Sequence, residues 1–138
     1  MLDEGSEFGA RVARRLRKEM IVWLTTVTPS GAPLPRPVGF LWDGGDNVSV
    51  YSKPGARIRN IARNPKVTLN FDGDGQGGDI VVLSGTAEVH ESGPSAAENA
   101  AWVAKYATEW ERWGMTAESF AQRFSVPVRI RIGAVHGR

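Results

Sequence analysis

Residues 51–71 (YSKPGARIRNIARNPKVTLNF) constrain the fold most, because they predict a strand, a tight turn, a short basic helix over 56–63 and a second strand in direct succession. The segment contains no acid and five cations: Lys53, Arg57, Arg59, Arg63 and Lys66. The whole chain has a formal net charge of only +2, so the positive charge is concentrated here. Backbone N–H groups at a helix start, together with cations, bind phosphate. The segment predicts either a site for a phosphate-bearing ligand or a surface helix whose arginines face water.

Within this segment, the residues nearest the turn Pro54-Gly55 are the candidate phosphate ligands. Arg57 lies closest to the turn, and Ser52 adds a hydroxyl at the end of the preceding strand. Arg59 follows two residues later, so the helix directs it to a different side. Charge-assisted hydrogen bonds contribute about 1.5–3 kcal/mol each, so three or four of them could anchor an organic phosphate.

The length of 138 residues predicts one domain that covers residues 1–138. The chain has no cysteine, which excludes disulfides, thiolate zinc sites and cysteine nucleophiles. Residues 1–7 are acidic and polar, unlike the cationic start of a signal peptide. No apolar stretch is long enough to span a membrane. We therefore expect a cytoplasmic protein that does not contact membranes.

The apolar pattern and the turn signals predict six strands and three or four helices. The expected strands are residues 21–27, 33–42, 48–52, 67–72, 79–90 and 126–135. The expected helical segments are 7–20 with Ser6 as its N-cap, 56–63, 95–114, and 116–124 with a simple cap at Thr116. Mostly hairpin connections favour the α+β class, as a small antiparallel β-barrel with flanking helices.

Two of these strands contain residues that restrict their place in a sheet. Pro33, Pro35 and Pro37 cannot donate to a β-ladder, so strand 33–42 should lie at an edge or a bulge, with part of its backbone free. Gly85, within strand 79–90, predicts a bend or bulge.

The sequence shows no pattern of catalytic or metal-ligating residues. His90 and His136 have no carboxylate or serine at a recognisable spacing, so no catalytic residue is assigned. Asp72-Gly73-Asp74 lacks the rest of a calcium loop, and no metal site is expected. Nucleic-acid binding by the basic segment and the basic face of helix 7–20 is disfavoured, because the aromatic residues are not interleaved with the cations.

The order of these motifs resembles the pyridoxamine-phosphate-oxidase-like split β-barrel superfamily over residues 8–135. The chain is most similar to its flavin/deazaflavin oxidoreductases of actinobacteria, the coenzyme F420-dependent branch. The motifs that carry the resemblance are Arg57-Ile58-Arg59-Asn60-Ile61, the following Asn64-Pro65-Lys66-Val67, and Leu83-Ser84-Gly85-Thr86-Ala87.

The resemblance implies a cofactor site and assigns residues to it. Arg57 would bind the cofactor phosphate, and the second strand would lie along the ring system and offer backbone hydrogen bonds. The implied cofactor-binding residues are Thr25, Pro35, Arg36, Pro37, Val38, Tyr51, Ser52, Lys53, Arg57, Arg59 and Asn60. It also implies a homodimer with both cofactor sites at the interface, and hydride transfer between the reduced cofactor and a small electron-poor organic acceptor.

Two departures from the FMN-dependent oxidases favour coenzyme F420 over FMN. Those enzymes place a second basic residue late in the second strand, where this chain continues from Arg36 with Pro37-Val38-Gly39-Phe40. They also have adjacent cations after the turn, where this chain has Ala56-Arg57. Cations that could meet the polyglutamate tail of a deazaflavin are Arg11, Arg14, Arg15, Lys53 and Arg63. The alternatives are an FMN-dependent enzyme of the same fold and a protein that binds a cofactor or tetrapyrrole without catalysis.

Overall fold

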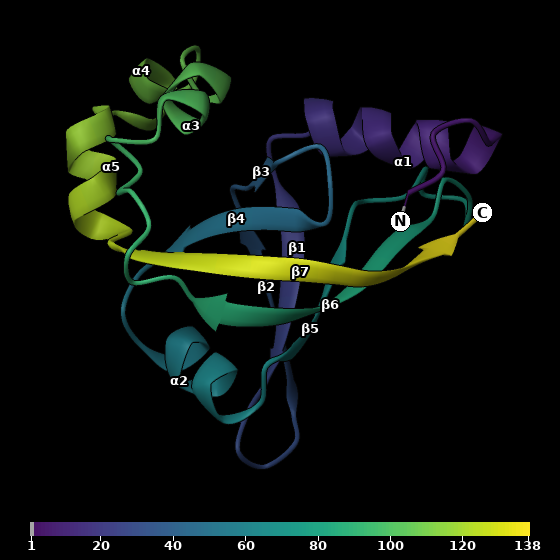
Figure 1. Cartoon of the computed structure of the whole chain (residues 1–138), viewed down its shortest axis with the longest axis horizontal. Coiled ribbons are helices and arrows are strands. Elements are labelled where there is room, and N and C mark those ends of the chain that lie inside the picture. The colour runs from purple at the N-terminus through teal and green to yellow at the C-terminus, as the bar shows by residue number, and fades with distance from the viewer. Residues whose placement is uncertain (1) are drawn as a thin grey trace.

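The computed structural model describes residues 2–138, in which seven strands and five helices are present (Figure 1). The helices are α1 (Glu7–Lys18), α2 (Ala56–Arg63), α3 (Ala100–Lys105), α4 (Trp110–Trp113) and α5 (Ala117–Arg123). The strands are β1 (Val22–Val27), β2 (Pro33–Val38), β3 (Leu41–Trp42), β4 (Asn47–Ser52), β5 (Lys66–Asn70), β6 (Val81–Val89) and β7 (Val126–Gly137). The predicted α+β antiparallel barrel is confirmed.

The sheet must curl because β2 and β3 are neighbours in the chain but lie at opposite edges of the sheet. The strand order is β2-β1-β5-β6-β7-β4-β3, and only Gly39 and Phe40 connect the first strand of this order to the last. The two edges therefore meet at Phe40 and diverge away from it, which leaves a barrel that is split along one side. The prediction of one strand over 33–42 is wrong for this reason, and the sheet has seven strands rather than six.

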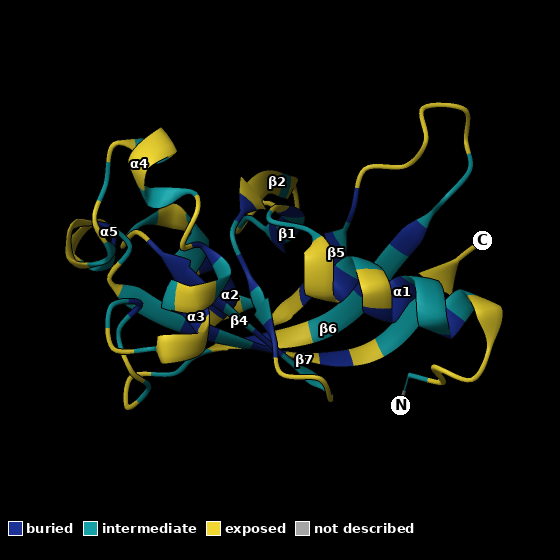
Figure 2. Cartoon of the chain, turned by 90° about the horizontal axis from the view of Figure 1, so that it is seen from above, coloured by how far each residue is buried: buried dark blue, intermediate teal, exposed yellow. Residues whose placement is uncertain are grey.

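The barrel interior is filled by alternate residues of the central strands. Leu24, Leu69, Leu83 and Ile130 are each almost fully buried, whereas their neighbours in sequence lie on the outer face (Figure 2). Gly85 interrupts this alternation with a shift in register against β7, which confirms the predicted bulge. A Cβ at this position would lie 2.4 Å from the backbone oxygen of Arg131, so only glycine fits.

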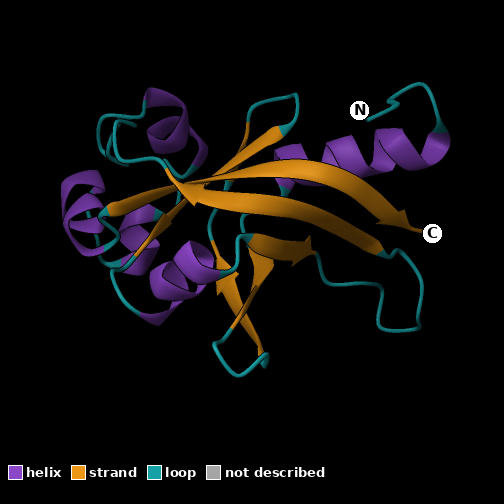
Figure 3. Ribbon diagram, turned by 60° about the horizontal axis from the view of Figure 1, so that its bottom comes forward, coloured by secondary structure: helices purple, strands orange, loops and turns teal. Residues whose placement is uncertain are grey.

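The helices lie at two ends of the sheet. Figure 3 shows α1 apart from the other helices, which gather at the opposite end. Ser6 caps α1 as predicted, by accepting a hydrogen bond from the Gly9 backbone N–H. The predicted helix over 95–114 is instead two short helices, of which α3 begins after its N-cap Asn99. Thr116 forms a reciprocal capping box with Ser119, not the simple cap that was predicted, because a serine hydroxyl replaces the usual acid.

Two side chains of the α3 segment fix it to the junction between β2 and β3. The Phe40 backbone N–H donates to the Tyr106 hydroxyl at 2.8 Å, and that hydroxyl lies 2.9 Å from the Met20 carbonyl oxygen. Lys105 Nζ donates to the Phe40 carbonyl at 2.7 Å and lies over the Phe40 ring. The junction that closes the barrel thus also holds the helices that follow β6.

Lys105 should make the stability of the fold depend on pH. Burial lowers the pKa of Lys105 to about 8 from 10.5, although Glu19 nearby opposes this shift. Between these values the unfolded chain binds more protons than the folded chain, so stability rises as the pH rises. Relative to a Lys105→Met variant, the native protein should gain about 1–3 kcal/mol of unfolding free energy from pH 8 to pH 10. Urea titrations at both pH values test this, and equal pH dependence in the two proteins would contradict it.

Candidate functional site

A cavity of about 290 Å³ opens where the edges of the barrel diverge. The end of β2, the end of β4 and the start of α2 form one part of its wall, and the α3–α5 segment forms the rest. The lining residues are Ile21, Pro37, Val38, Gly39, Tyr51, Arg57, Trp102, Trp113, Met115, Phe120 and Phe124. Four residues predicted to bind a cofactor, Pro37, Val38, Tyr51 and Arg57, are therefore brought together here.

Arg57 is the one charged residue among those lining residues. It is half-buried, and its Nη1 donates to Ser52 Oγ at 3.0 Å, while the Ser52 hydroxyl donates to the Lys53 carbonyl. Burial lowers the pKa of Arg57, and the positive charge of Arg36 lowers it further. Within residues 2–138, neither Arg36 nor Arg57 forms an ion pair with an acid. Two neighbouring cations without a counter-charge suit a bound anion.

The start of α2 adds backbone donors beside Arg57. Gly55 occupies the N-cap position with a φ of 144°, a conformation that favours glycine, and no side chain caps the helix. The first N–H groups of α2 are consequently left for solvent or a ligand. The turn, the helix start and Arg57 thus lie together, and the phosphate site stays a prediction.

Aromatic side chains form the rest of the cavity wall. Trp102 contacts Tyr51 edge to face at 4.7 Å between ring centroids, and Phe120 stacks on Phe124 at 4.5 Å. The Tyr51 hydroxyl donates to the Pro94 carbonyl and accepts from Asn99 Nδ2, so it holds the segment before α3 in place. Burial raises the pKa of Tyr51, which remains a neutral phenol at physiological pH. This apolar wall suits a flat apolar ring.

The remaining predicted site residues lie outside this cavity. Arg36 is exposed on β2, and Lys53 extends over the Phe124 ring at 5.5 Å. Arg59 is exposed, whereas Asn60 is buried and donates to Thr26 Oγ1 at 3.1 Å, a contact that joins α2 to β1. Two others line separate hollows on the surface of the sheet: Pro35 and Thr25.

Two of the cations considered for a polyglutamate tail already have acidic partners. Arg11 and Arg15 both form ion pairs with Asp79, at 3.1 and 2.9 Å, and Arg15 also pairs with Glu19. The pairing with Asp79 was not predicted from the sequence, because Asp79 lies more than 60 residues away in the chain. Arg14 and Arg63 are exposed.

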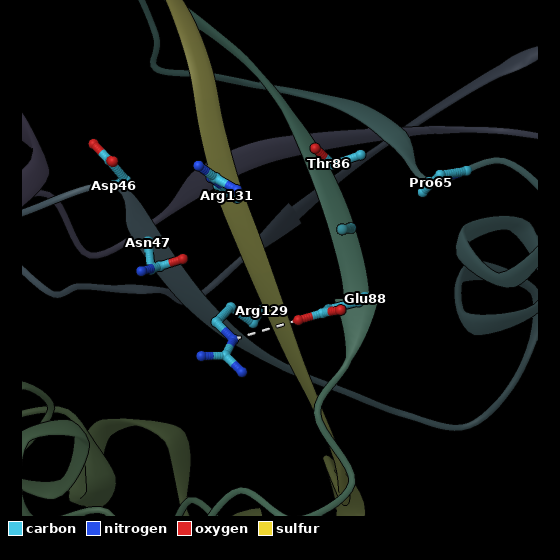
Figure 4. A pocket seen from close by; sticks show the side chains of 8 residues that line it. Asp46, Asn47, Pro65, Thr86, Glu88, Arg129 and Arg131 are labelled. Atoms are coloured by element: carbon cyan, nitrogen blue, oxygen red, sulfur yellow. Dashed lines mark ion pairs between the residues drawn. The ribbon is translucent and has the colours of Figure 1, made fainter. Parts of the chain in front are cut away.

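A larger hollow, of about 660 Å³, lies elsewhere, on the outer face of β4, β7 and β6 (Figure 4). Its lining is polar, and Arg129 forms an ion pair there with Glu88 at 3.6 Å. Arg129 also contacts His90 Nδ1 at 3.0 Å. Its two arginines, Arg129 and Arg131, are balanced by Glu88 and Asp46, and it contains none of the predicted site residues. We therefore assign the functional site to the cavity at Arg57.

The cofactor-binding residues named from the sequence include no aromatic residue after residue 100. Trp102, Trp113, Phe120 and Phe124 nevertheless line the cavity at Arg57. In residues 2–138 no cluster of acidic residues and histidines is arranged to hold a metal ion. Over the same residues, no helix has the length and apolar character needed to cross a bilayer.

Comparisons with known proteins agree with this fold. A family model described as pyridoxamine 5'-phosphate oxidase matches residues 8–134, whereas no curated protein matches. The chain is similar to the structure of a Listeria innocua protein assigned to pyridoxamine 5'-phosphate oxidase, with a TM-score of 0.65 and 20% identity over 92% of this chain and 94% of that one. It is also similar to an F420 reductase, with a TM-score of 0.64 and 21% identity over 91% and 95%. A FAD-binding protein from Mesorhizobium loti gives a TM-score of 0.65 and 20% identity over 91% and 88%.

Proposed function

The chain belongs to the pyridoxamine 5'-phosphate oxidase family, and from this premise we propose that it is a coenzyme F420-dependent oxidoreductase that transfers hydride between the reduced deazaflavin and a small electron-poor organic acceptor. The observation that carries the proposal is the half-buried Arg57 at the end of an aromatic cavity, beside Arg36 and without an acid to neutralise either cation. A ligand that carries an anionic group and a flat ring would match the two unneutralised arginines and the aromatic wall of the cavity.

Each part of the cleft has a role in binding. Arg57 and the free N–H groups of α2 hold the cofactor phosphate, and Ser52 orients the guanidinium through its hydrogen bond. Trp102, Phe120 and the other aromatic residues exclude water from the ring. The bound deazaflavin supplies the hydride, and the protein supplies binding and orientation. We assign no proton donor in the cavity, so the proton of the overall reduction comes from solvent.

FMN is the second candidate, and two observations of the structure favour it. The sequence lacks the adjacent cations that FMN-dependent oxidases place after the turn, but Arg36 lies close enough to Arg57 to influence its pKa. Arg36 can thus provide the second positive charge from β2. The pairing of Arg11 and Arg15 with Asp79 also removes two cations from the set proposed for a polyglutamate tail.

The predicted homodimer remains part of the proposal. The outer face of β1, β5 and β6 has a hollow lined by small side chains, among them Thr25, Thr68 and Ser84, which are half-buried in the single chain. A second copy bound to this face would place Thr25 in the dimer interface. This agrees with the expectation that the cofactor sites, to which Thr25 is assigned, lie at that interface.

Turnover tests the proposed activity. Reduced coenzyme F420 is mixed with the protein and a panel of acceptors that contains a quinone, an enone and a nitroaromatic compound, and reoxidation of the deazaflavin is followed by absorbance. We expect protein-dependent reoxidation with at least one acceptor, and its loss in the Arg57→Ala variant. Binding of the cofactor without turnover of any acceptor would instead support the non-catalytic carrier.

A further inference from the structure

Two indole nitrogens in the segment that contains α3, α4 and α5 are buried and have no hydrogen-bond partner within residues 2–138: Trp102 Nε1 and Trp110 Nε1. Buried polar groups of folded proteins are nearly always paired, because an unpaired donor loses its bond to water and gains none. The packed neighbours of both side chains are aromatic rings, and the face of a ring is only a weak acceptor. Two unused N–H donors therefore remain in this segment.

Only one of these donors belongs to the cavity at Arg57. Trp102 lines that cavity, whereas Trp110 is not among its lining residues. The Trp102 indole, which is 1% exposed, packs against two other lining residues. Its ring meets Tyr51 edge to face, and a Cβ at Gly39 would lie 3.4 Å from its Cη2 atom. An unpaired donor in the wall of a cavity indicates a ligand that brings an acceptor.

The part of the wall beside Trp102 is formed by short helices. Phe120 of α5 packs against Trp102 at 5.9 Å between ring centroids. α5 has seven residues, and α4 has four residues and no side-chain cap. Trp113 and Met115, which line the cavity between Trp102 and α5 in the chain, are half-buried. Small movements of these side chains would let an oxygen atom of a flat ligand reach the shielded N–H.

The interior of the cavity suits an uncharged ligand. Arg57 is the one charged residue among the lining residues, and it is assigned to the cofactor phosphate. The cofactor ring is expected along β2, where Pro35 and Arg36 are exposed outside the cavity. The apolar interior, with the Trp102 N–H as its unpaired donor, is thus left for the electron acceptor.

We propose that Trp102 binds the substrate by donating its N–H to the carbonyl oxygen of a neutral, flat electron acceptor. The inference rests on the proposed function, because it names the substrate class of the same site. During reduction, a carbon conjugated to the carbonyl gains the hydride, the electron pair of the double bond moves to the oxygen, and solvent supplies the proton. The two electrons come from the reduced deazaflavin, and the indole keeps its own proton. The hydrogen bond strengthens as negative charge develops on the oxygen, so Trp102 stabilises the transition state.

Nuclear magnetic resonance detects this hydrogen bond without turnover. The isotope-labelled full-length protein is titrated with naphthoquinone and with naphthalene, which has the same rings and no oxygen. The indole N–H signals are assigned with the Trp102→Phe and Trp110→Phe variants. We expect naphthoquinone, and not naphthalene, to move the Trp102 signal downfield, while the Trp110 signal stays in place. A Trp102 signal that naphthoquinone leaves in place, or that both ligands move equally, would overturn the inference.

Replacing Trp102 with benzothienylalanine removes the donor and keeps the volume, because sulfur takes the place of the N–H group. We expect kcat/KM for the reduction of naphthoquinone by reduced F420 to fall by about 10- to 100-fold. The dissociation constant of oxidised F420 should not change, because Arg57 holds its phosphate.

The same replacement at Trp110 is the matched control, since it removes an equally unpaired N–H that lies outside the cavity. It should leave kcat/KM unchanged. Equal losses at both positions, or no loss at Trp102, would overturn the inference and leave the proposed function standing. If naphthoquinone moves the Trp102 signal but no acceptor is reduced, the proposed function falls and the donor assignment stands.

Discussion

Replacing Arg57 with alanine should weaken cofactor binding by about 10- to 100-fold, because the variant loses charge-assisted hydrogen bonds that contribute about 1.5–3 kcal/mol. Arg57 is the charged residue that lines the cavity, and no acid of the described chain shares its charge. The dissociation constants for F420 and FMN, measured by fluorescence titration, give the result. Circular dichroism should show an intact fold, since Arg57 contributes one side-chain hydrogen bond, to Ser52.

Lys18→Ala is the matched control for charge. Lys18 is exposed at the end of α1, so its removal lowers the net charge by the same amount without touching the cleft. We expect the Lys18→Ala variant to bind the cofactor with an affinity within about twofold of that of the native protein, because an exposed distant charge is screened by salt. Equal losses in both variants would mean that Arg57 acts only through overall charge, which contradicts the assigned role.

Replacing Trp102 with alanine should lower the free energy of unfolding by about 3–5 kcal/mol, the usual cost of deleting a buried large aromatic side chain. Trp102 is 1% exposed and packs against Tyr51, Tyr106 and Phe120. Its removal would leave a void between α3 and β4 and loosen the wall of the cavity. Urea unfolding followed by far-UV circular dichroism measures the loss without relying on tryptophan fluorescence.

Trp102→Phe distinguishes packing from hydrogen bonding in that result. Trp102 Nε1 is buried without a hydrogen-bond partner, so phenylalanine removes no hydrogen bond and leaves a smaller void. The Phe variant should lose clearly less stability than the Ala variant. Similar losses in the two variants would show that the stability of the protein does not depend on how much volume the side chain of residue 102 fills.

Local patterns in the sequence predicted most of the helices and strands well. The Ser6 cap, the helix over 56–63, the bulge at Gly85 and the edge position of the prolines each depend on residues close together in the chain. The physics that fixes them is local as well: a side-chain cap, a backbone without Cβ, or a missing N–H. The break at Gly39 and Phe40 was missed because it arises from closure of the whole barrel.

The composition of the site could be predicted only in part, because its walls come from distant segments. Arg57 and Tyr51 lie in one motif, but Arg36 approaches Arg57 from a strand that pairs elsewhere in the sheet. Trp102 and Phe120 reach the cavity because hydrogen bonds from distant residues, such as that between Tyr106 and Phe40, anchor the α3 segment to the barrel. A sequence pattern records none of these long-range contacts.

The most direct test of the central claim is a fluorescence titration of the native protein with oxidised coenzyme F420 and, side by side, with FMN. The proposed function predicts saturable binding of F420 that is tighter than binding of FMN. Preference for FMN would keep the site and change the cofactor, which contradicts the proposed F420 dependence. Binding of neither would leave Arg57 and Arg36 as solvated surface cations and contradict the assignment of the cleft as a cofactor site.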